Sequence, residues 1–297
     1  MNRREFTHLT LVTAATVLLP KLARAGQPAR AIVDTHAHVF RRDLPMVPGR
    51  RYTPDYDATV EDYLGVLDAN GVARGVLVQP SFLGTDNHYL LAALRRHPQR
   101  LRGVAVVAPA VSAGELEELE GSGIVGLRLN LFGQPLPDFT AVPWPALLRQ
   151  IAKLNWHIEI HREAKDLPVV LPPLLEAGVK IVVDHFGRPD PQLGIEDPGF
   201  RALLGMGASR RVWVKLSGAY RNGSGGRGAA IARAGLPLLL PAFGTDRLVW
   251  ASDWPHTQFE KTESYAAVCA ERDTWFTNAA ERTAILETTP AKLFHFT

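Results

Sequence analysis

The sequence of 297 residues is poor in cysteine and has no apolar run long enough to cross a membrane. Its one cysteine, Cys269, excludes an intramolecular disulfide framework and a thiolate metal cluster. With 46% hydrophobic and 21% charged residues, the composition argues against a disordered or multi-span membrane protein. The length allows two domains of average size or one α/β barrel.

Most of the chain also lacks an excess of positive charge. The formal net charge of +3 comes from residues 1–25, which contain four basic residues and Glu5. The remaining residues contain equal numbers of basic and acidic side chains. We therefore expect no nucleic-acid partner and no electrostatic attraction to a membrane surface.

Residues 1–25 have the pattern of an export signal. A twin arginine at positions 3–4 precedes an apolar run at 9–19, which is too short to span ~30 Å of hydrocarbon. Small residues follow in the segment Ala23–Ala25, as signal peptidase requires. The pattern resembles a twin-arginine (Tat) signal peptide, which implies the Tat export machinery as a partner and a periplasmic mature chain without a membrane anchor, beginning near Gly26. A retained anchor or a buried amphipathic helix is the alternative interpretation.

Residues 26–297 alternate between apolar, β-branched stretches and segments of helical length, such as Thr59–Asn70. No composition break marks a second domain. This alternation predicts a single α/β domain, a distorted (β/α)8 TIM barrel, whose function lies at the carboxyl ends of its strands. The glycine-rich segment 221–228 is typical of a mobile loop. The expected strands are residues 32–36, 76–80, 103–108, 126–131, 157–161, 180–185, 212–217 and 248–253.

The first expected strand ends in two histidines. Asp34, His36 and His38 are spaced two apart, so we expect them to share the barrel interior, with Val33 and Thr35 facing the helices. Two imidazoles at this spacing can chelate one metal ion, because ~7 Å between Cα atoms lets both nitrogens reach a point between them. The pair alone is also compatible with core packing.

Three further strands bring histidine or aspartate to the same rim. Strand 157–161 alternates so that His161 points inward near its end, and the expected sixth and eighth strands end in His185 and Asp253. His157 lies deeper and is expected to be a core or supporting residue. If these residues served only to stabilise the fold, the same coincidence would have to occur on four strands at matching heights. The set therefore predicts an active site.

Three motifs resemble those of the amidohydrolase superfamily: DTHAH at 34–38, DHFGRP at 184–189 and SDWPH at 252–256. More narrowly, they are similar to the branch that contains 2-pyrone-4,6-dicarboxylate lactonase, sulfomuconolactone hydrolase and sugar lactonases. Segments 78–87, 127–130 and 214–217 also resemble this branch, so the resemblance covers most of the expected barrel.

The resemblance implies a role for each matching residue. Asp253 would be the general base that takes a proton from the attacking water, and His185 would assist it. His36, His38 and His185 would hold or polarise the scissile carbonyl. Arg128 would bind a substrate carboxylate, for which its planar fork is suited. The other implied substrate contacts are Arg221, Ser81, Thr85 and Asn87.

The proteins that the sequence resembles differ in whether they use a metal ion. Metal-dependent relatives hold one zinc through the strand-one pair, a strand-five histidine and the strand-eight aspartate, and leave the strand-six histidine free for proton transfer. Here these ligands would be His36, His38, His161 and Asp253. Such a site lowers the pKa of bound water towards ~7. The pyrone-dicarboxylate lactonase works without a metal and lacks the strand-five histidine, so a metal-free mechanism stays open.

The sequence therefore predicts an exported hydrolase that opens the lactone of a small carboxylated organic acid. A metal-dependent decarboxylase of an unsaturated carboxylic acid is an alternative, because the same residues would serve it. A non-catalytic periplasmic solute-binding protein is a further alternative, although a receptor has no need of a base such as Asp253. The exact substrate and the oligomeric state do not follow from the sequence.

Overall fold

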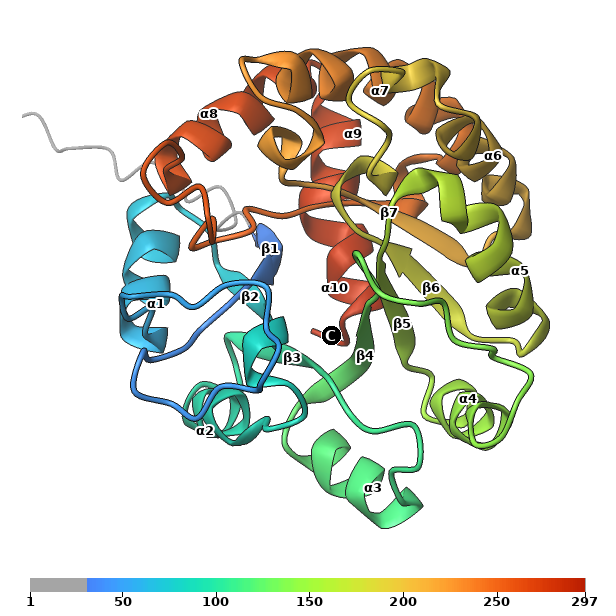
Figure 1. Cartoon of the computed structure of the whole chain (residues 1–297). Helices are drawn as coiled ribbons and strands as arrows, with labels where there is room; N and C mark the ends of the chain where they lie inside the picture. The colour runs from blue at the N-terminus through green and yellow to red at the C-terminus, as the bar shows by residue number, and fades with distance from the viewer. Residues whose placement is uncertain (1–30, 297) are drawn as a thin grey trace, which may run out of the picture.

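A computed structural model describes residues 31–296, so the expected export signal at 1–25 lies outside the described residues. Eight parallel strands form one sheet in sequence order, with helices around the outside (Figure 1). The expected single-domain (β/α)8 barrel is confirmed. The strands are β1 (Val33–Ala37), β2 (Arg74–Val78), β3 (Leu101–Ala105), β4 (Ile124–Asn130), β5 (His157–His161), β6 (Lys180–Val183), β7 (Val212–Leu216) and β8 (Leu248–Trp250).

The two ends of the sheet meet just beyond β1 and β8. The backbone N–H of Asp253 donates to the carbonyl of His36 at 2.9 Å, and that of His38 donates to Trp254 at 2.7 Å. These bonds continue the strand pairing around the ring. They also fix the backbone of the first and last expected catalytic segments side by side.

Half of the described α-helices begin at a residue whose side chain accepts hydrogen bonds from the first free N–H groups. Thr59 and Ser112 form capping boxes with Asp62 and Glu115, which satisfy free N–H groups at the starts of α1 and α3. In the described part of the chain no helix is long and apolar enough to span a bilayer. The helices are α1 (Val60–Ala69), α2 (His88–Arg96), α3 (Ala113–Gly121), α4 (Trp144–Lys153), α5 (Leu167–Glu176), α6 (Pro198–Met206), α7 (Arg227–Phe243), α8 (Tyr265–Trp275), α9 (Ala279–Thr283) and α10 (Thr289–Leu293).

The C-terminal segment closes the amino-terminal end of the barrel and crosses behind its opening (Figure 1). Phe294 and Phe296 pack with the valines that line the interior. Arg74, the first residue of β2, donates to the carbonyl of Phe296 at 2.9 Å, and Arg102 donates to that of His295 at 3.1 Å. The interior is therefore accessible from the carboxyl ends of the strands.

The expected orientation of the first residues of β1 is wrong. Val33 packs with the interior valines and Phe294, whereas Asp34 accepts a hydrogen bond from Tyr265 of α8 at 3.1 Å. The pairing of β1 with β2 shifts register between Asp34 and Ala37, and such an irregularity exchanges the two faces of a strand. His36 still lies inside, next to side chains of β5 and β7.

Two other expectations need adjustment. The second strand starts at Arg74 and ends at Val78, because Pro80 cannot donate a ladder hydrogen bond and the chain turns into a short 3-10 helix at Ser81–Leu83. The glycine-rich segment 221–228 is not one open loop. It contains the end of a 3-10 helix at Ala219–Asn222 and the first residues of α7.

Candidate active site

A cavity of about 180 Å³ lies at the carboxyl ends of the strands. It is smaller than the ~300–1,000 Å³ typical of sites for drug-sized ligands, which favours a small organic acid. Most of the expected site residues line it, and His36 lies buried just beneath them. The lining residues are His38, Arg51, Tyr52, Ser81, Arg128, Asn130, Phe132, His161, His185, Arg188, Arg221, Asp253, Gln258 and Phe259.

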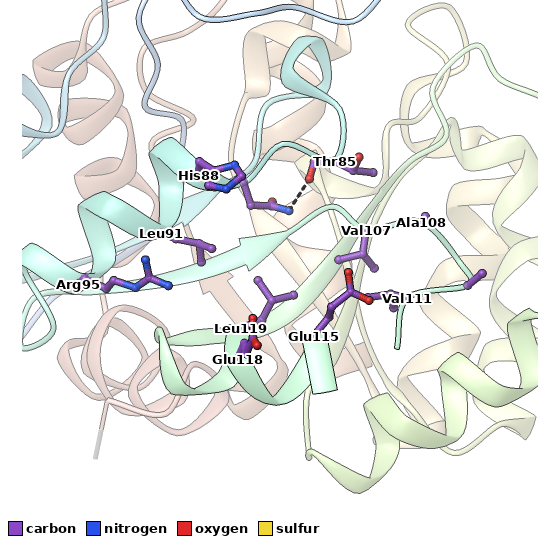
Figure 2. A pocket seen from close by; sticks show the side chains of 12 residues that line it. Thr85, His88, Leu91, Arg95, Val107, Ala108, Val111, Glu115, Glu118 and Leu119 are labelled. Atoms are coloured by element: carbon purple, nitrogen blue, oxygen red, sulfur yellow. Dashed lines mark hydrogen bonds between the residues drawn. The ribbon is translucent and has the colours of Figure 1, made fainter. Parts of the chain in front are cut away.

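Thr85 and Asn87 are not in this cavity, contrary to their expected role as substrate contacts. They border a larger hollow of about 390 Å³ between α2 and α3, outside the barrel (Figure 2). Asn87 donates to the carbonyls of Thr85 and Val106 at 3.0 and 2.8 Å, so its amide holds two loops together. The larger hollow contains none of the histidines or aspartates of the motifs, and the smaller cavity is the candidate site.

His36 and His38 form a tight pair at the end of β1. Their Nε2 atoms lie 3.2 Å apart, and Nδ1 of His38 lies 2.7 Å from the carbonyl of Val78. Because a carbonyl only accepts, Nδ1 of His38 carries its proton, and Nε2 is an acceptor. Burial, reinforced by His36, lowers the pKa of His38 well below its usual value, so its ring is neutral.

Asp253 presents one free carboxylate oxygen to this pair. Its Oδ2 accepts hydrogen bonds from Nε of Arg221 and from the hydroxyl of Tyr220, the latter at 2.7 Å. Among the described residues Oδ1 has no hydrogen-bond partner, and it lies 3.9 Å from Nε2 of both His36 and His38. Burial alone would raise the pKa of Asp253, but Arg221 and neighbouring histidines hold it well below the usual range. The group is an ionised carboxylate.

His185 is held in a constrained turn after β6. His185, Phe186 and Arg188 have φ of 51°, 57° and 53°, a left-handed conformation that is costly for residues with side chains and is common at functional sites. Nδ1 of His185 lies 2.9 Å from Oγ of Ser217. A Cβ at Gly218 would lie 2.8 Å from the same Nδ1, so glycine is required there. Burial lowers the pKa of His185 well below its usual value.

His161 completes the histidine cluster from β5. Its ring stacks on Phe132 with centroids 5.4 Å apart, and its centroid lies 5.1 Å from that of His185. Neither ring nitrogen has a hydrogen-bond partner within residues 31–296. Burial, followed by the nearby His185, lowers the pKa of His161 well below its usual value. It is a neutral imidazole with free nitrogens at the cavity.

The cluster includes a group that could hold a metal ion. One ligand atom each from His36, His185 and Asp253 lie within 4.8 Å of one another. Two members, His36 and Asp253, belong to the ligand set expected from the sequence. His161 stands outside this tight group, next to His185.

Four arginines surround the cavity, and two of them were expected. Arg128 binds Asp184 at 3.1 Å, and Arg221 binds Asp253. The sequence reasoning missed Arg51 and Arg188, although Arg188 stands in the DHFGRP motif. Neither forms an ion pair with any described carboxylate, and both guanidinium groups lie over the ring of Phe132, at 5.1 and 4.8 Å from its centroid. Burial, together with Arg221, lowers the pKa of Arg188 to about 10.

The family profile described as amidohydrolase matches residues 33–296. The chain belongs to the amidohydrolase family. It is 36% identical over 242 residues to the 2-pyrone-4,6-dicarboxylate hydrolase of Comamonas testosteroni, covering 77% of this chain and 78% of the relative.

Two solved structures are also similar to this amidohydrolase. A Pseudomonas putida protein provisionally named 2-pyrone-4,6-dicarboxylic acid hydrolase is 46% identical, with a TM-score of 0.85 over 90% of this chain and 98% of that one. An Acinetobacter baumannii protein provisionally given the same activity is 40% identical, with a TM-score of 0.86 over 89% and 99% of the two chains. The latter structure contains citric acid.

Proposed function

We propose that this amidohydrolase opens the ring of a small lactone that carries at least two carboxylates. The observation that carries the proposal is Oδ1 of the ionised Asp253, which has no hydrogen-bond partner among residues 31–296 and faces the His36–His38 pair at the cavity. A carboxylate so placed can take a proton from a water molecule. The relatives named above support hydrolysis of a cyclic ester, and none of the three is named for decarboxylation.

The arginines indicate the charge of the substrate. Arg51 and Arg188 have no carboxylate partner among the described residues, and both line the cavity. Both guanidinium groups also lie over the ring of Phe132, which places them next to the cavity. Two unpaired guanidinium groups fit two carboxylates, each bound through paired hydrogen bonds. The citric acid in the Acinetobacter relative agrees with a polyanionic ligand.

The reaction follows from the positions of these groups. Asp253 removes a proton as the water oxygen bonds to the ring carbonyl, and the carbonyl electrons move to its oxygen. Donors around this oxygen stabilise the charge that develops there, the usual major contribution in acyl transfer. When the tetrahedral intermediate collapses, the C–O bond of the ring breaks, and protonated Asp253 returns its proton to the leaving oxygen, directly or through His185.

Zinc is the metal that we propose for the site. Its residues fit such an ion, because facing imidazole nitrogens and the unpartnered Oδ1 of Asp253 are ligands that zinc prefers. His36, His38 and Asp253 would hold it, with His161 as the fourth ligand proposed from the sequence. When bound, zinc would polarise the carbonyl and favour hydroxide near neutral pH. The proton-accepting role of Asp253 also operates without a metal.

Ring opening distinguishes this function from decarboxylation. The purified protein should hydrolyse dicarboxylated lactones, with one acid equivalent released per ring opened and no carbon dioxide. Asp253→Asn should abolish turnover while retaining the fold. Carbon dioxide release from enoic acids without lactone turnover would show a decarboxylase instead. Tight binding with the ligand recovered unchanged would show a solute-binding protein.

The proposed location rests on the sequence of residues 1–25 alone. The twin arginine and the small residues near Ala25 support export through the Tat machinery to the periplasm. Cell fractionation with N-terminal sequencing tests this proposal. A mature chain beginning near Gly26 in the periplasmic fraction is expected, and replacement of both arginines by lysine should retain the precursor in the cytoplasm.

A further inference from the structure

A second charged cluster lies buried directly beneath the active site. Lys215 of β7 and Glu159 of β5 form an ion pair in which both side chains are fully buried, and Asp184 lies beside them after β6. The Nζ atom of Lys215 is 3.0 Å from Nδ1 of His36 and 3.6 Å from Oδ1 of Asp184. The motif analysis assigned no role to this lysine.

The acceptors around the lysine form a cation-binding group in their own right. One ligand atom each from His36, Glu159 and Asp184 lie within 4.8 Å of one another. Burying two carboxylates is costly unless cations lie against them. Lys215 supplies one such cation, and Arg128 supplies the other, at 3.1 Å from Asp184 and 3.7 Å from Glu159.

The lysine is enclosed from below as well. The ring of Phe294, from the C-terminal segment that closes the barrel, lies 5.9 Å from Nζ. Lys215 therefore reaches His36 from inside a sealed region, and it touches the opposite edge of the imidazole from the one that faces His38 and Asp253.

We propose that the ammonium group of Lys215 is a built-in cation that occupies the group formed by His36, Glu159 and Asp184. In this position it acts as a positioning residue: it donates to Nδ1 of His36 and fixes the ring. In the metal-free protein the proton of His36 then lies on Nε2, which donates to Nε2 of His38, whose own Nδ1–H donates to Val78. By occupying the group formed by His36, Glu159 and Asp184, the ammonium also excludes an exogenous metal from it, which limits the protein to a single ion.

Two variants of Lys215 that both remove the charge, one smaller than lysine and one of similar size, test the built-in cation. Lys215→Ala removes the charge and opens space, whereas Lys215→Met removes the charge but fills the space. After equilibrium dialysis of the full-length protein against zinc, we expect Lys215→Ala to bind one more ion per chain than the wild type, and Lys215→Met to bind no more than the wild type. Folded Lys215→Ala with unchanged stoichiometry would overturn the proposal.

A rescue experiment tests the positioning role. Both variants should lose about 10- to 100-fold in kcat, the range for loss of a charge-assisted hydrogen bond, with a smaller effect on KM. Methylammonium should restore much of the loss in Lys215→Ala and none in Lys215→Met. Equal responses of the two variants to methylammonium would contradict a role for the ammonium itself.

The wild-type protein provides a measurement that does not depend on the variants folding. In the chelator-treated protein, ¹⁵N spectra of His36 should show a proton-free Nδ1 and a protonated Nε2, with His36→Gln used to assign the signals. A protonated Nδ1 would mean that His36 donates to Glu159 and that Lys215 does not position it. The stoichiometry and the spectra need no substrate, so their failure is distinct from failure of the proposed lactone hydrolysis.

Discussion

The Nε2 atoms of His36 and His38 face each other at 3.2 Å. Since the proton of His38 is committed to the carbonyl of Val78, two arrangements are compatible with this short approach. Either Nε2 of His36 carries a proton and donates it, or both atoms direct lone pairs at a shared cation. In the second case the proton of His36 moves to Nδ1, within reach of Glu159 Oε1 at 3.2 Å.

Metal content is the first prediction that follows. Protein purified without chelator should contain about one zinc per chain, because the proposed ligands form a single site. His38→Ala should lose the zinc together with activity, whereas His157→Phe, a change to another buried histidine of the barrel, should retain both. Fully active protein without metal would leave Asp253 as the sole group that activates water.

His161 and His185 are the two candidates for the zinc ligand that completes the set formed by His36, His38 and Asp253. The family resemblance assigns His161 to the metal and leaves His185 to move protons, whereas the structure places His185 in the tight ligand group. We expect His161→Ala to lower zinc affinity about 10- to 100-fold or more, and His185→Ala to retain zinc while kcat falls. Isothermal titration with zinc distinguishes the two, because the reverse pattern would make His185 the ligand.

Asp253 should remain a base well into the acid range. Asp253→Asn should lower kcat by several orders of magnitude, because no proton acceptor remains at the attacking water. Arg221 holds the pKa of Asp253 down, so Arg221→Gln should raise that pKa and move the acid limb of the kcat/KM profile to higher pH. Arg51→Gln serves as the control, since Arg51 does not touch Asp253. If the acid limb is unchanged in Arg221→Gln, it does not report the protonation of Asp253.

We expect the cavity arginines without a carboxylate partner among the described residues to bind the substrate, unlike Arg128 and Arg221, which already pair with aspartates. Arg51→Gln and Arg188→Gln should raise KM for a dicarboxylated lactone about 10- to 100-fold with little change in kcat, and should matter less for a monocarboxylated analogue. Similar losses for both substrates would exclude a role in recognising a second carboxylate.

Arg128 should behave differently from the simple binding residue that the sequence predicts. Its guanidinium is buried against Asp184 at 3.1 Å, so Arg128→Ala leaves that carboxylate with one cation fewer. We expect a loss of stability of about 3–5 kcal/mol in addition to any rise in KM. Urea unfolding measures it, and Arg51→Gln, at an exposed position, is the matched control.

The sequence predicts the features that depend on local pattern and misses those that depend on distant partners. The strict alternation of His157–His161 predicts the bounds of β5, as observed, and its inward residues, which contact Phe294, Lys215 and the cavity. The register shift in β1 has no recognisable sequence pattern, so the sequence assigned Val33 and Asp34 to the wrong faces of the strand. The sequence around Lys215 does not distinguish it from other lysines in strands, because its partner Glu159 lies 56 residues earlier.

Phe132 shows the same limit for the substrate pocket. Its position directly after the fourth strand marks it as a loop residue, but its contacts come from Arg51 and Arg188, which lie far away in the sequence on either side. Periodicity carries no information about such contacts. The histidines and aspartates could be predicted because the barrel itself places all strand ends on one rim.

His157 should make the protein sensitive to acid. It is buried against Phe294, both ring nitrogens lack hydrogen-bond partners among residues 31–296, and burial lowers its pKa to about 3. The unfolded chain takes up a proton on this residue near pH 6.5, whereas the folded chain does so only near pH 3. The free energy of unfolding should therefore fall as the pH is lowered through this window, by roughly 1 kcal/mol per pH unit from this residue.

His157→Phe should remove that contribution. The variant and the wild type should be compared by urea unfolding at pH 7 and at pH 5, and the difference between the two pH values should be smaller in the variant. Because Phe294 already packs edge-on against the ring at 5.1 Å, a phenyl group suits the position. His88→Phe is a control at the surface: its side chain is 95% exposed, and its ion pair with Asp86 is of the exposed kind that contributes little to stability, so the pH dependence should change much less. Equal slopes for wild type and His157→Phe would show that His157 is protonated without loss of the fold.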